Sequence, residues 1–176
     1  MNSITGKMSD FTHRLSFDDI PEVAEKEARR FLLDSVGCAL AAVNHEDMQA
    51  MHRYIEHLGG APEASVIGTG YLTNMANAGL MNCLLTRAMD YNDIYWEQDP
   101  SHPSDMIGIA LSCGEAMGKS GKDVLTAILI AYELELRWCH AAHPGVREIG
   151  WHHATLTQFV SSFVAGKLLN LTPDQL

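Results

Sequence analysis

Apolar residues recur at intervals of three and four positions along most of this chain, the spacing that places them on one face of an α-helix. The clearest pattern follows Pro21 and runs to about Val43, with Leu32, Val36 and Leu40 on one face. Patterns of the same kind cover residues 46–58, 74–89, 106–118, 121–140 and 154–169. Helices with apolar faces become stable by packing on one another, so the sequence predicts an all-α fold, a multi-helix bundle.

Local signals define the ends of several of these helices. Pro21 suits the first helical position, and Glu22 lies near the positive end of the helix dipole. Gly59-Gly60 is a termination signal for the helix over residues 46–58. By contrast, Ser65-Val66-Ile67-Gly68 is a short β-branched run between glycines. This run predicts at most one short β-hairpin, near residues 64–72.

Charge and composition narrow the class of protein. With 47% hydrophobic and 19% charged residues, the chain has ordinary globular usage. The net charge of −10 disfavours nucleic acid and anionic membrane surfaces as partners. No apolar run approaches the roughly 18–20 residues that cross a bilayer, and the N-terminus lacks an apolar signal core. We therefore expect a cytoplasmic protein that contacts neither membrane nor nucleic acid.

The cysteines give no sign of a metal cluster. None of them belongs to a CxxC pair, and each lies within an apolar helical stretch, at Cys38, Cys83, Cys113 and Cys139. Zinc and iron–sulfur sites require clustered thiolates. We interpret these residues as buried free thiols.

Polar groups gather in the segment 90–104, which has two prolines and no helical period. It brings Asp90, Asn92, Asp93, His102 and Ser104 between two apolar helices, and loops on a rigid scaffold are where catalytic groups concentrate. If the preceding helix extends by one turn, Asp90 and Asp93 share a face, and their pKa values can differ in a way that suits proton transfer. Ordinary turn chemistry before a proline is the alternative.

A second candidate is the segment 150–155, with the adjacent residues His152 and His153 before a helix. These histidines can donate hydrogen bonds to carboxylates or carry protons near neutral pH. The alternative is that one caps the helix and the other is solvated. A metal site is a further alternative, built from Asp90, Asp93, His102, His140, His143 and His153. There is no HExxH pattern and no tight ligand cluster, so we expect no metal.

Two stretches within these segments resemble a known family. MDYNDIYW, followed by SHPSD, is similar to a signature of the MmgE/PrpD family, whose members include dehydratases and decarboxylases of small polycarboxylates. RRFLLDSVGCALAA, SGKDVLTAILIAYELELR and GWHHATLTQFVSSFVAGKLLNLTPDQL resemble further family stretches in the same order. The similarity extends from about Ala28 to the end of the chain and covers well under half of a complete member.

The resemblance implies a large helical domain followed by a smaller α+β domain, usually in a homodimer, with no metal or organic cofactor. Residues 1–176 would then be a truncated N-terminal portion of the helical domain, completed by the missing remainder or by a second chain. Thr172-Pro173 is a helix-start signal close to the end, which agrees with truncation. An acidic chain that binds a polycarboxylate must supply local cations, from its histidines or from outside this segment.

Matching positions carry the family's site residues onto this sequence. Asp90, Asp93 and His102 match catalytic positions, and His153 matches another because its distance to Lys167 agrees with the dehydratases. The candidates for binding substrate are Asn92, Ser104 and His152, and His152 is also the catalytic fallback. The resemblance implies that His153 or His102 removes a proton next to a carboxylate. The other histidine, or a protonated Asp, then assists the loss of water.

The spacing from Asp93 to His102 favours 2-methylcitrate dehydratase over the decarboxylases. Ile94 stands where the family usually has Thr, and it cannot donate a hydrogen bond to a substrate carboxylate. The family's later catalytic lysine and tyrosine lie beyond the end of this chain. Decarboxylation or epimerisation therefore stays an alternative, as does a catalytically incomplete helical subunit that serves assembly or binding.

Overall fold

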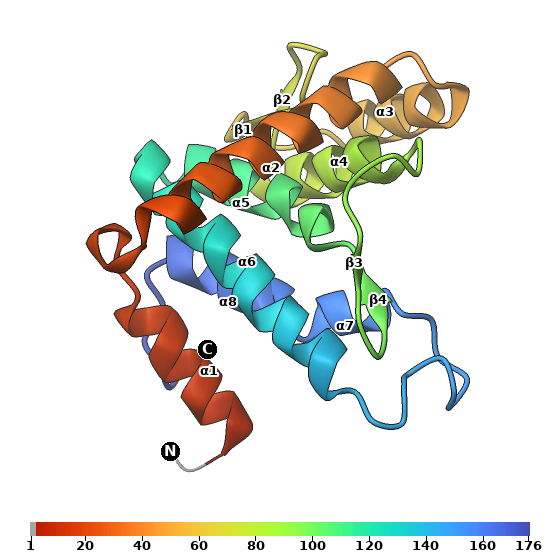
Figure 1. Cartoon of the computed structure of the whole chain (residues 1–176). Coiled ribbons are helices and arrows are strands. Elements are labelled where there is room, and N and C mark those ends of the chain that lie inside the picture. The colour runs from red at the N-terminus through yellow and green to blue at the C-terminus, as the bar shows by residue number, and fades with distance from the viewer. Residues whose placement is uncertain (1–2) are drawn as a thin grey trace.

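The computed structural model describes residues 3–176, and these form a helical protein (Figure 1). The helices are α1 (Ile4–Arg14), α2 (Glu22–Ala42), α3 (Glu46–Leu58), α4 (Met75–Arg87), α5 (Ile107–Ala116), α6 (Gly121–Ala141), α7 (Thr155–Gln158) and α8 (Ser161–Leu168), with 3₁₀ turns η1 (Phe17–Asp19) and η2 (Pro103–Met106). The antiparallel strand pairs in this part of the chain are β1 (Ala64–Ser65) with β2 (Leu72–Thr73), and β3 (Tyr95–Trp96) with β4 (Pro100–Ser101). The predicted all-α class is confirmed.

The helix ends follow from local chemistry. In α6, Ser120 and Asp123 form a capping box, in which the Asp123 carboxylate accepts from the Ser120 backbone N–H at 2.9 Å. Gly59 ends α3 with a φ of 67°, a left-handed value that glycine adopts without strain. Pro21 occupies the N-cap of α2, one position before the first helical residue where we expected it.

The helices pack around two connected apolar clusters. The larger one joins α5, α6 and α8, and it includes Met106, Ile107, Ala110, Leu125, Ile128, Ile130, Leu134, Val160, Phe163, Val164 and Leu168. The smaller one joins α2, α3 and α4, through Ala39, Ala42, Met48, Ile55, Met81 and Leu85. In Figure 1, α1 and α8 lie near both chain termini, whereas α3 and the β1–β2 pair lie at the opposite end.

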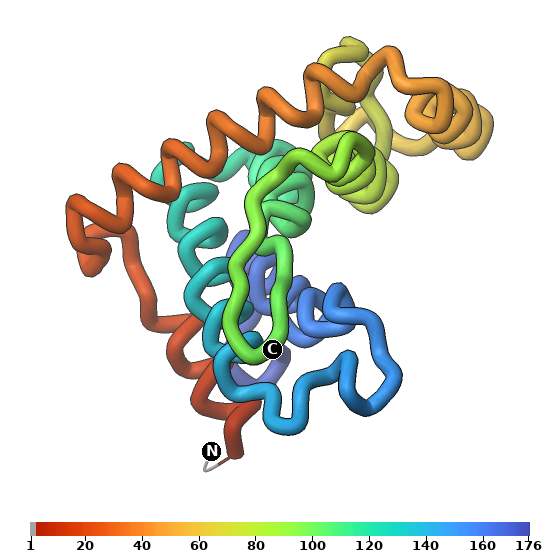
Figure 2. The backbone as a smooth tube through the Cα atoms, turned by 45° about the vertical axis from the view of Figure 1, so that its right-hand side comes forward, coloured from red at the N-terminus to blue at the C-terminus, as the bar shows by residue number. Residues whose placement is uncertain are grey.

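Two loops stand out against this scaffold. The first loop (residues 88–102) leaves α4, contains β3 and β4 and leads to η2 and α5. The second loop (residues 142–154) joins α6 to α7. Figure 2 shows the first loop, in green, passing in front of α6 and lying beside the second loop, in blue. Gln98 bonds to Glu148 across the two loops at 3.2 Å, which agrees with this view.

Helices α4 and α5 approach each other closely at Gly108. A Cβ atom at this glycine would lie 2.6 Å from the backbone nitrogen of Cys83 and 2.8 Å from its Sγ. No side chain fits against backbone at such a distance, so only glycine allows the two helices to come this near. Because the first loop runs from α4 to α5, this contact also sets the distance that the loop spans.

Two elements differ from the sequence-based expectation. Helix α1 was not predicted, although Met8 and Phe11 pack on the larger cluster; the small buried residues between them hide its apolar face. The helix expected over 154–169 is divided into α7 and α8, because the break buries Val160 and lets Phe159 stack on Trp138 with ring centroids 5.2 Å apart. The helix start at Thr172 forms one hydrogen-bonded turn.

The expected hairpin near residues 64–72 is present, with Ala64 opposite Thr73. The pair β3–β4 is a second one, in a segment that we expected to be an irregular loop. Aromatic Tyr95 and Trp96 favour extended backbone, and the short turn after them allows the pairing with Pro100 and Ser101. No helix in residues 3–176 combines the length and the apolar character that a bilayer crossing requires.

The thiols lie where the sequence suggested. Cys38, Cys113 and Cys139 are buried, Cys83 is partly buried, and all are free. Burial raises the pKa of the Cys83 thiol to about 12 and that of the Cys139 thiol to about 12, so both stay protonated at neutral pH.

Gly108→Ala should lower the free energy of unfolding by about 1–3 kcal/mol, because the added methyl group meets the backbone of α4. Gly37→Ala is the matched control, since Gly37 lies in the middle of α2 with no atom within 4 Å of the added Cβ. It should raise stability by about 0.5–1 kcal/mol. Urea unfolding measures both changes. Equal effects of the two substitutions would contradict the close contact.

Candidate active site

The first loop begins with a turn at Asp90, whose φ of 50° lies in the left-handed region that Asp tolerates. Helix α4 has already ended at Arg87, so Asp90 and Asp93 do not share a helical face, contrary to our expectation. The Asp90 side chain is 77% exposed and pairs with the Arg87 guanidinium. This hydrogen bond and the charge of Arg87 lower the pKa of Asp90, so it is ionised at neutral pH.

The Asp93 carboxylate is fully engaged within the protein. The Tyr132 hydroxyl of α6 donates to Oδ2 at 2.6 Å. The backbone N–H of Ser104 donates to Oδ1 at 3.2 Å, and the Ser104 hydroxyl donates to the same oxygen. Burial, followed by the charge of Asp93, raises the pKa of Tyr132, so the phenol remains a donor. These contacts fasten the middle of the first loop to α6 and η2.

The backbone carbonyl of Asp93 determines the tautomer of His102. Nδ1 of His102 lies 2.5 Å from this oxygen. A carbonyl oxygen only accepts hydrogen bonds, so Nδ1 carries the hydrogen and Nε2 is the unprotonated nitrogen of the neutral ring. His102 is only 7% exposed, so burial limits its motion.

His153, from the second loop, faces His102. The two ring centroids are 5.5 Å apart, and His152 lies 4.1 Å from His153 on the other side. Nε2 of His153 is buried and has no hydrogen-bond partner among residues 3–176. Burial, and then the neighbouring His152 and His102, lower the pKa of His153 below its usual 6.5. His153 is therefore a neutral imidazole at neutral pH.

His152 has a different place. It is exposed, and its Nδ1 accepts a hydrogen bond from the Ala154 backbone N–H at 3.2 Å, just before α7. The N-cap of α7 is Ala154, with no side-chain cap hydrogen bond, so His152 does not cap the helix; His153 turns inward.

Asn92 and Ser104 hold the loop together from inside. The Asn92 amide donates to Ser104 Oγ at 2.8 Å and to Asp105 Oδ1 at 3.1 Å, and Asn92 is 8% exposed. Burial raises the pKa of Asp105, and the charge of His102 opposes that rise. Within the first loop and η2, the pKa of Asp90 is lowered and that of Asp105 is raised. The amide nitrogen of Asn92 is already bonded within the chain.

Glu135 of α6 is a site residue that the sequence reasoning missed. It is completely buried, and its Oε1 accepts hydrogen bonds from the Ser101 hydroxyl and, at 3.0 Å, from the Thr157 hydroxyl. Burial raises the pKa of Glu135 to about 7. The available signal was its position on the apolar stripe of α6, four residues after Ala131 and four before Cys139, where an acid is unexpected.

The two loops are also tied to each other through Asp99, which is 1% exposed. Its carboxylate accepts from the Val146 backbone N–H and lies 3.5 Å from Nε of Arg147. Its own N–H donates to the Cys139 carbonyl oxygen at 3.3 Å. The turn between β3 and β4 is thus attached to both the second loop and α6.

The metal alternative finds no support in the geometry. His140 and His143 are exposed, and His140 makes only a contact of 4.0 Å with Glu97. Among residues 3–176, no three His, Cys, Asp or Glu side chains are gathered so that they could hold a metal ion.

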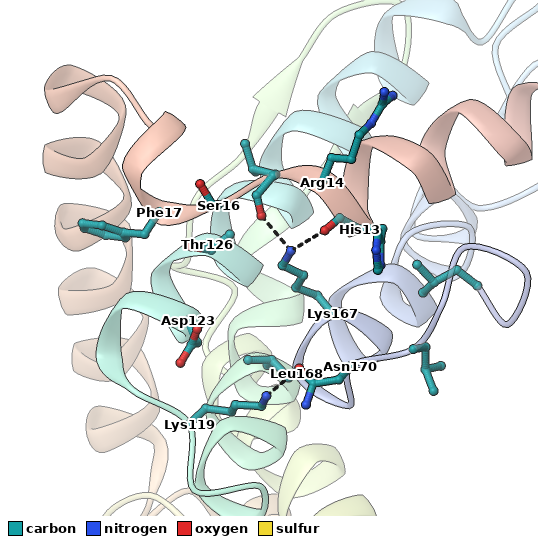
Figure 3. Close-up of a pocket in the computed structure, with 13 residues that line it drawn as sticks. His13, Arg14, Ser16, Phe17, Lys119, Asp123, Thr126, Lys167, Leu168 and Asn170 are labelled. Atoms are coloured by element: carbon teal, nitrogen blue, oxygen red, sulfur yellow. Dashed lines mark hydrogen bonds between the residues drawn. The ribbon is translucent and has the colours of Figure 1, made fainter.

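A pocket of about 320 Å³ lies elsewhere, where α1, α6 and α8 meet (Figure 3). Nζ of Lys167 donates to the carbonyl oxygens of His13 and Leu15 at 3.0 and 2.6 Å. Nζ of Lys119 donates to Oδ1 of Asn170 at 2.7 Å. Lys167 thereby binds the end of α1 to α8. These polar groups serve packing, and the chemically active groups gather at the two loops instead.

Comparison with known proteins points to one family. Residues 6–176 match the family model of the MmgE/PrpD N-terminal domain. The chain is 28% identical over 162 residues to "Probable 2-methylcitrate dehydratase" of Saccharomyces cerevisiae, covering 84% of this chain and 31% of that protein. It is 27% identical over 173 residues to "2-methylcitrate dehydratase" of Salmonella typhi, covering 92% and 35%.

A fungal relative, "Alkylcitrate dehydratase phiI" from Fungal sp. (strain ATCC 74256), is 26% identical over 190 residues, covering 96% of this chain and 36% of its own length. The chain therefore spans about a third of the length of the curated relatives it matches.

The ring nitrogens of the two inward histidines should titrate differently. In ¹H–¹⁵N NMR spectra, His153 should have a pKa below 6.5, and His102 should carry its hydrogen on Nδ1 when neutral. Because burial is the largest cause, His153 should stay below 6.5 in a His152→Asn variant. A His153 that titrates at 6.5 or above, or a His102 protonated on Nε2 alone, would contradict this geometry.

Proposed function

The chain belongs to the MmgE/PrpD family, and from this membership we propose that it supplies the histidine-bearing part of the active site of a hydro-lyase. The substrate class is a small polycarboxylate with a hydroxyl group, and 2-methylcitrate or a related alkylcitrate is the best candidate, as the names of its relatives suggest. The observation that carries the proposal is the facing pair His102 and His153, one with a fixed tautomer and one with an unpartnered ring nitrogen.

Dehydration of such a substrate requires two proton transfers. A base removes a proton from the carbon next to a carboxylate, the C–H electrons form the new double bond, and the hydroxyl leaves as water after it gains a proton. The carbon acid is weak, so the base must be unprotonated and well placed at working pH. An imidazole with a lowered pKa meets this need.

His153 is the proposed base. Its lowered pKa keeps the ring neutral, and its buried Nε2 makes no hydrogen bond within the part of the chain that the structure describes. No protein hydrogen bond therefore has to break before Nε2 accepts a proton.

His102 is the proposed acid. Its Nδ1–H donates to the Asp93 carbonyl whether the ring is neutral or charged. Nε2 can therefore gain and lose a proton while the ring keeps its orientation, as proton delivery to a leaving hydroxyl requires. Asp93 itself acts by positioning His102 through its backbone, because its carboxylate is already bound by Tyr132 and Ser104.

A chain with a net charge of −10 needs local cations to bind a polycarboxylate, and two arginines are the candidates. After burial and the neighbouring histidines, the charges of Arg147 and Arg87 are the smaller causes that lower the pKa of His153. We propose that these guanidinium groups attract and hold the substrate carboxylates, since guanidinium forms paired hydrogen bonds to carboxylate. Asp90, paired with Arg87, then orients that cation and does not transfer protons.

A second protein surface completes the site in this proposal. Large apolar side chains around the two loops are exposed, at Tyr91 (82%), Trp96 (65%), Trp151 (63%), Ile149 (59%) and Ile94 (52%). Exposed apolar groups gathered in this way mark an interaction surface. The remainder of a longer protein, a second copy or a complementing chain would cover them, and the assembly or binding subunit is the alternative function that this observation favours.

The direct test is a thermal-shift titration of this chain with citrate and 2-methylcitrate, with sulfate as the control anion. A ligand that binds only the folded state stabilises it by about 2.7 kcal/mol at 100 times its Kd, so both polycarboxylates should raise the Tm. His153→Ala should remove most of this shift, whereas His140→Ala, at an exposed histidine outside the site, should retain it. Equal shifts with sulfate, or none with either polycarboxylate, would contradict the proposal.

A further inference from the structure

Glu135 is the buried ionisable group for which the proposed chemistry has no use, and it lies between the two loops. Ser101, which bonds to it, immediately precedes His102. Thr157, its second partner, lies in α7, one turn of chain after His153. One carboxyl oxygen, Oε1, accepts both hydrogen bonds. A displacement of Glu135 would therefore move both histidine-bearing segments.

The carboxyl is unfavourable for stability at this place. Oε2 is buried without a hydrogen-bond partner, and burying an unpaired polar oxygen carries an energetic cost. An apolar residue of the same size would pack in this position without that cost. The contribution of Glu135 therefore lies in the geometry that it imposes on its two partners.

Both histidine-bearing segments contact α6 through Glu135, and each has a further attachment. The Asp99 carboxylate ties the second loop to the first, and Phe159 at the end of α7 stacks on Trp138 of α6. The first loop is fastened to α6 at Asp93, through Tyr132, as well as at Ser101. The α7 segment that follows His153 is joined to α6 by the hydrogen bond from Thr157 to Glu135. His153 also has no partner for Nε2 that would hold its ring.

Building on the proposed function, we infer that Glu135 is a positioning residue that sets the separation and orientation of His102 and His153. It does so by holding Ser101 and Thr157 on a single oxygen. The role requires an acceptor oxygen at the place of Oε1. It requires neither a charge nor a proton on the side chain.

This distinction defines the test. Glu135→Gln keeps an acceptor oxygen, whereas Glu135→Leu has a similar size and no acceptor. In ¹H–¹⁵N NMR spectra of this chain, the Gln variant should keep the lowered pKa of His153 and the cross-peaks between the rings of His102 and His153. In the Leu variant, the cross-peaks should be lost and the pKa of His153 should move toward 6.5. Histidine signals in the Leu variant that match the wild type would overturn the inference.

A second pair of variants changes Thr157, which donates the hydrogen bond to Glu135, in case Glu135→Leu does not fold. Thr157→Ser keeps the hydroxyl and should resemble the wild type, whereas Thr157→Val removes it and should reproduce the loss of cross-peaks. Wild-type histidine signals in Thr157→Val would also overturn the inference. These readouts need no substrate, so a chain that fails to bind citrate would refute the proposed function and leave the role of Glu135 to be decided by the spectra.

Discussion

The hydrogen bonds that α6 makes through Tyr132 and Glu135 hold both histidine-bearing segments, and the arrangement of the site depends on them. These residues are three apart, so their side chains leave the same face of the helix. Tyr132 binds the Asp93 carboxylate, and Glu135 binds Ser101 and Thr157. The capping box at Ser120 fixes the start of α6, and the burial of one face in the core holds the helix in place. A rigid helix can thus hold two loops in a constant relation.

Asp93 links the helical scaffold to the proposed catalytic histidine His102. Its carboxylate fastens the first loop, and its backbone carbonyl selects the tautomer of His102. The close approach of α4 and α5 at Gly108 sets the two ends of the same loop. Substituting the Asp93 side chain would therefore disturb His102 indirectly, because the carbonyl moves when its anchor is lost. The backbone carbonyl of Asp93 thus orients His102, a role that a sequence comparison would assign to the Asp93 side chain.

Much of the helical fold followed from the sequence, because apolar periodicity is a local property. Apolar periodicity did not predict α1, because the buried residues of this helix include the small or polar Gly6, Ser9 and Thr12. The candidate segments were found from their polar content and from the family resemblance. The meeting of His102 with His153 depends on how distant segments pack, and residue spacing does not show this. Glu135 was overlooked because its neighbours on α6 are apolar.

The site also differs from the sequence-based expectation because residue spacing does not show the local backbone conformation or the packing of distant segments. Asp90 and Asp93 are three apart, but the left-handed backbone at Asp90 ends the helical geometry that would have aligned them. Two of the cations whose charge acts on His153 come from separate segments, Arg87 at the end of α4 and Arg147 in the second loop.

The central claim is that His153 removes a proton from carbon. Its most direct test is the incorporation of solvent deuterium into the methylene groups of citrate, followed by NMR in the presence of this chain. The wild type should exchange these protons, and His153→Ala should do so at a rate roughly 100-fold lower. Exchange that is as fast in His153→Ala as in the wild type would contradict the claim.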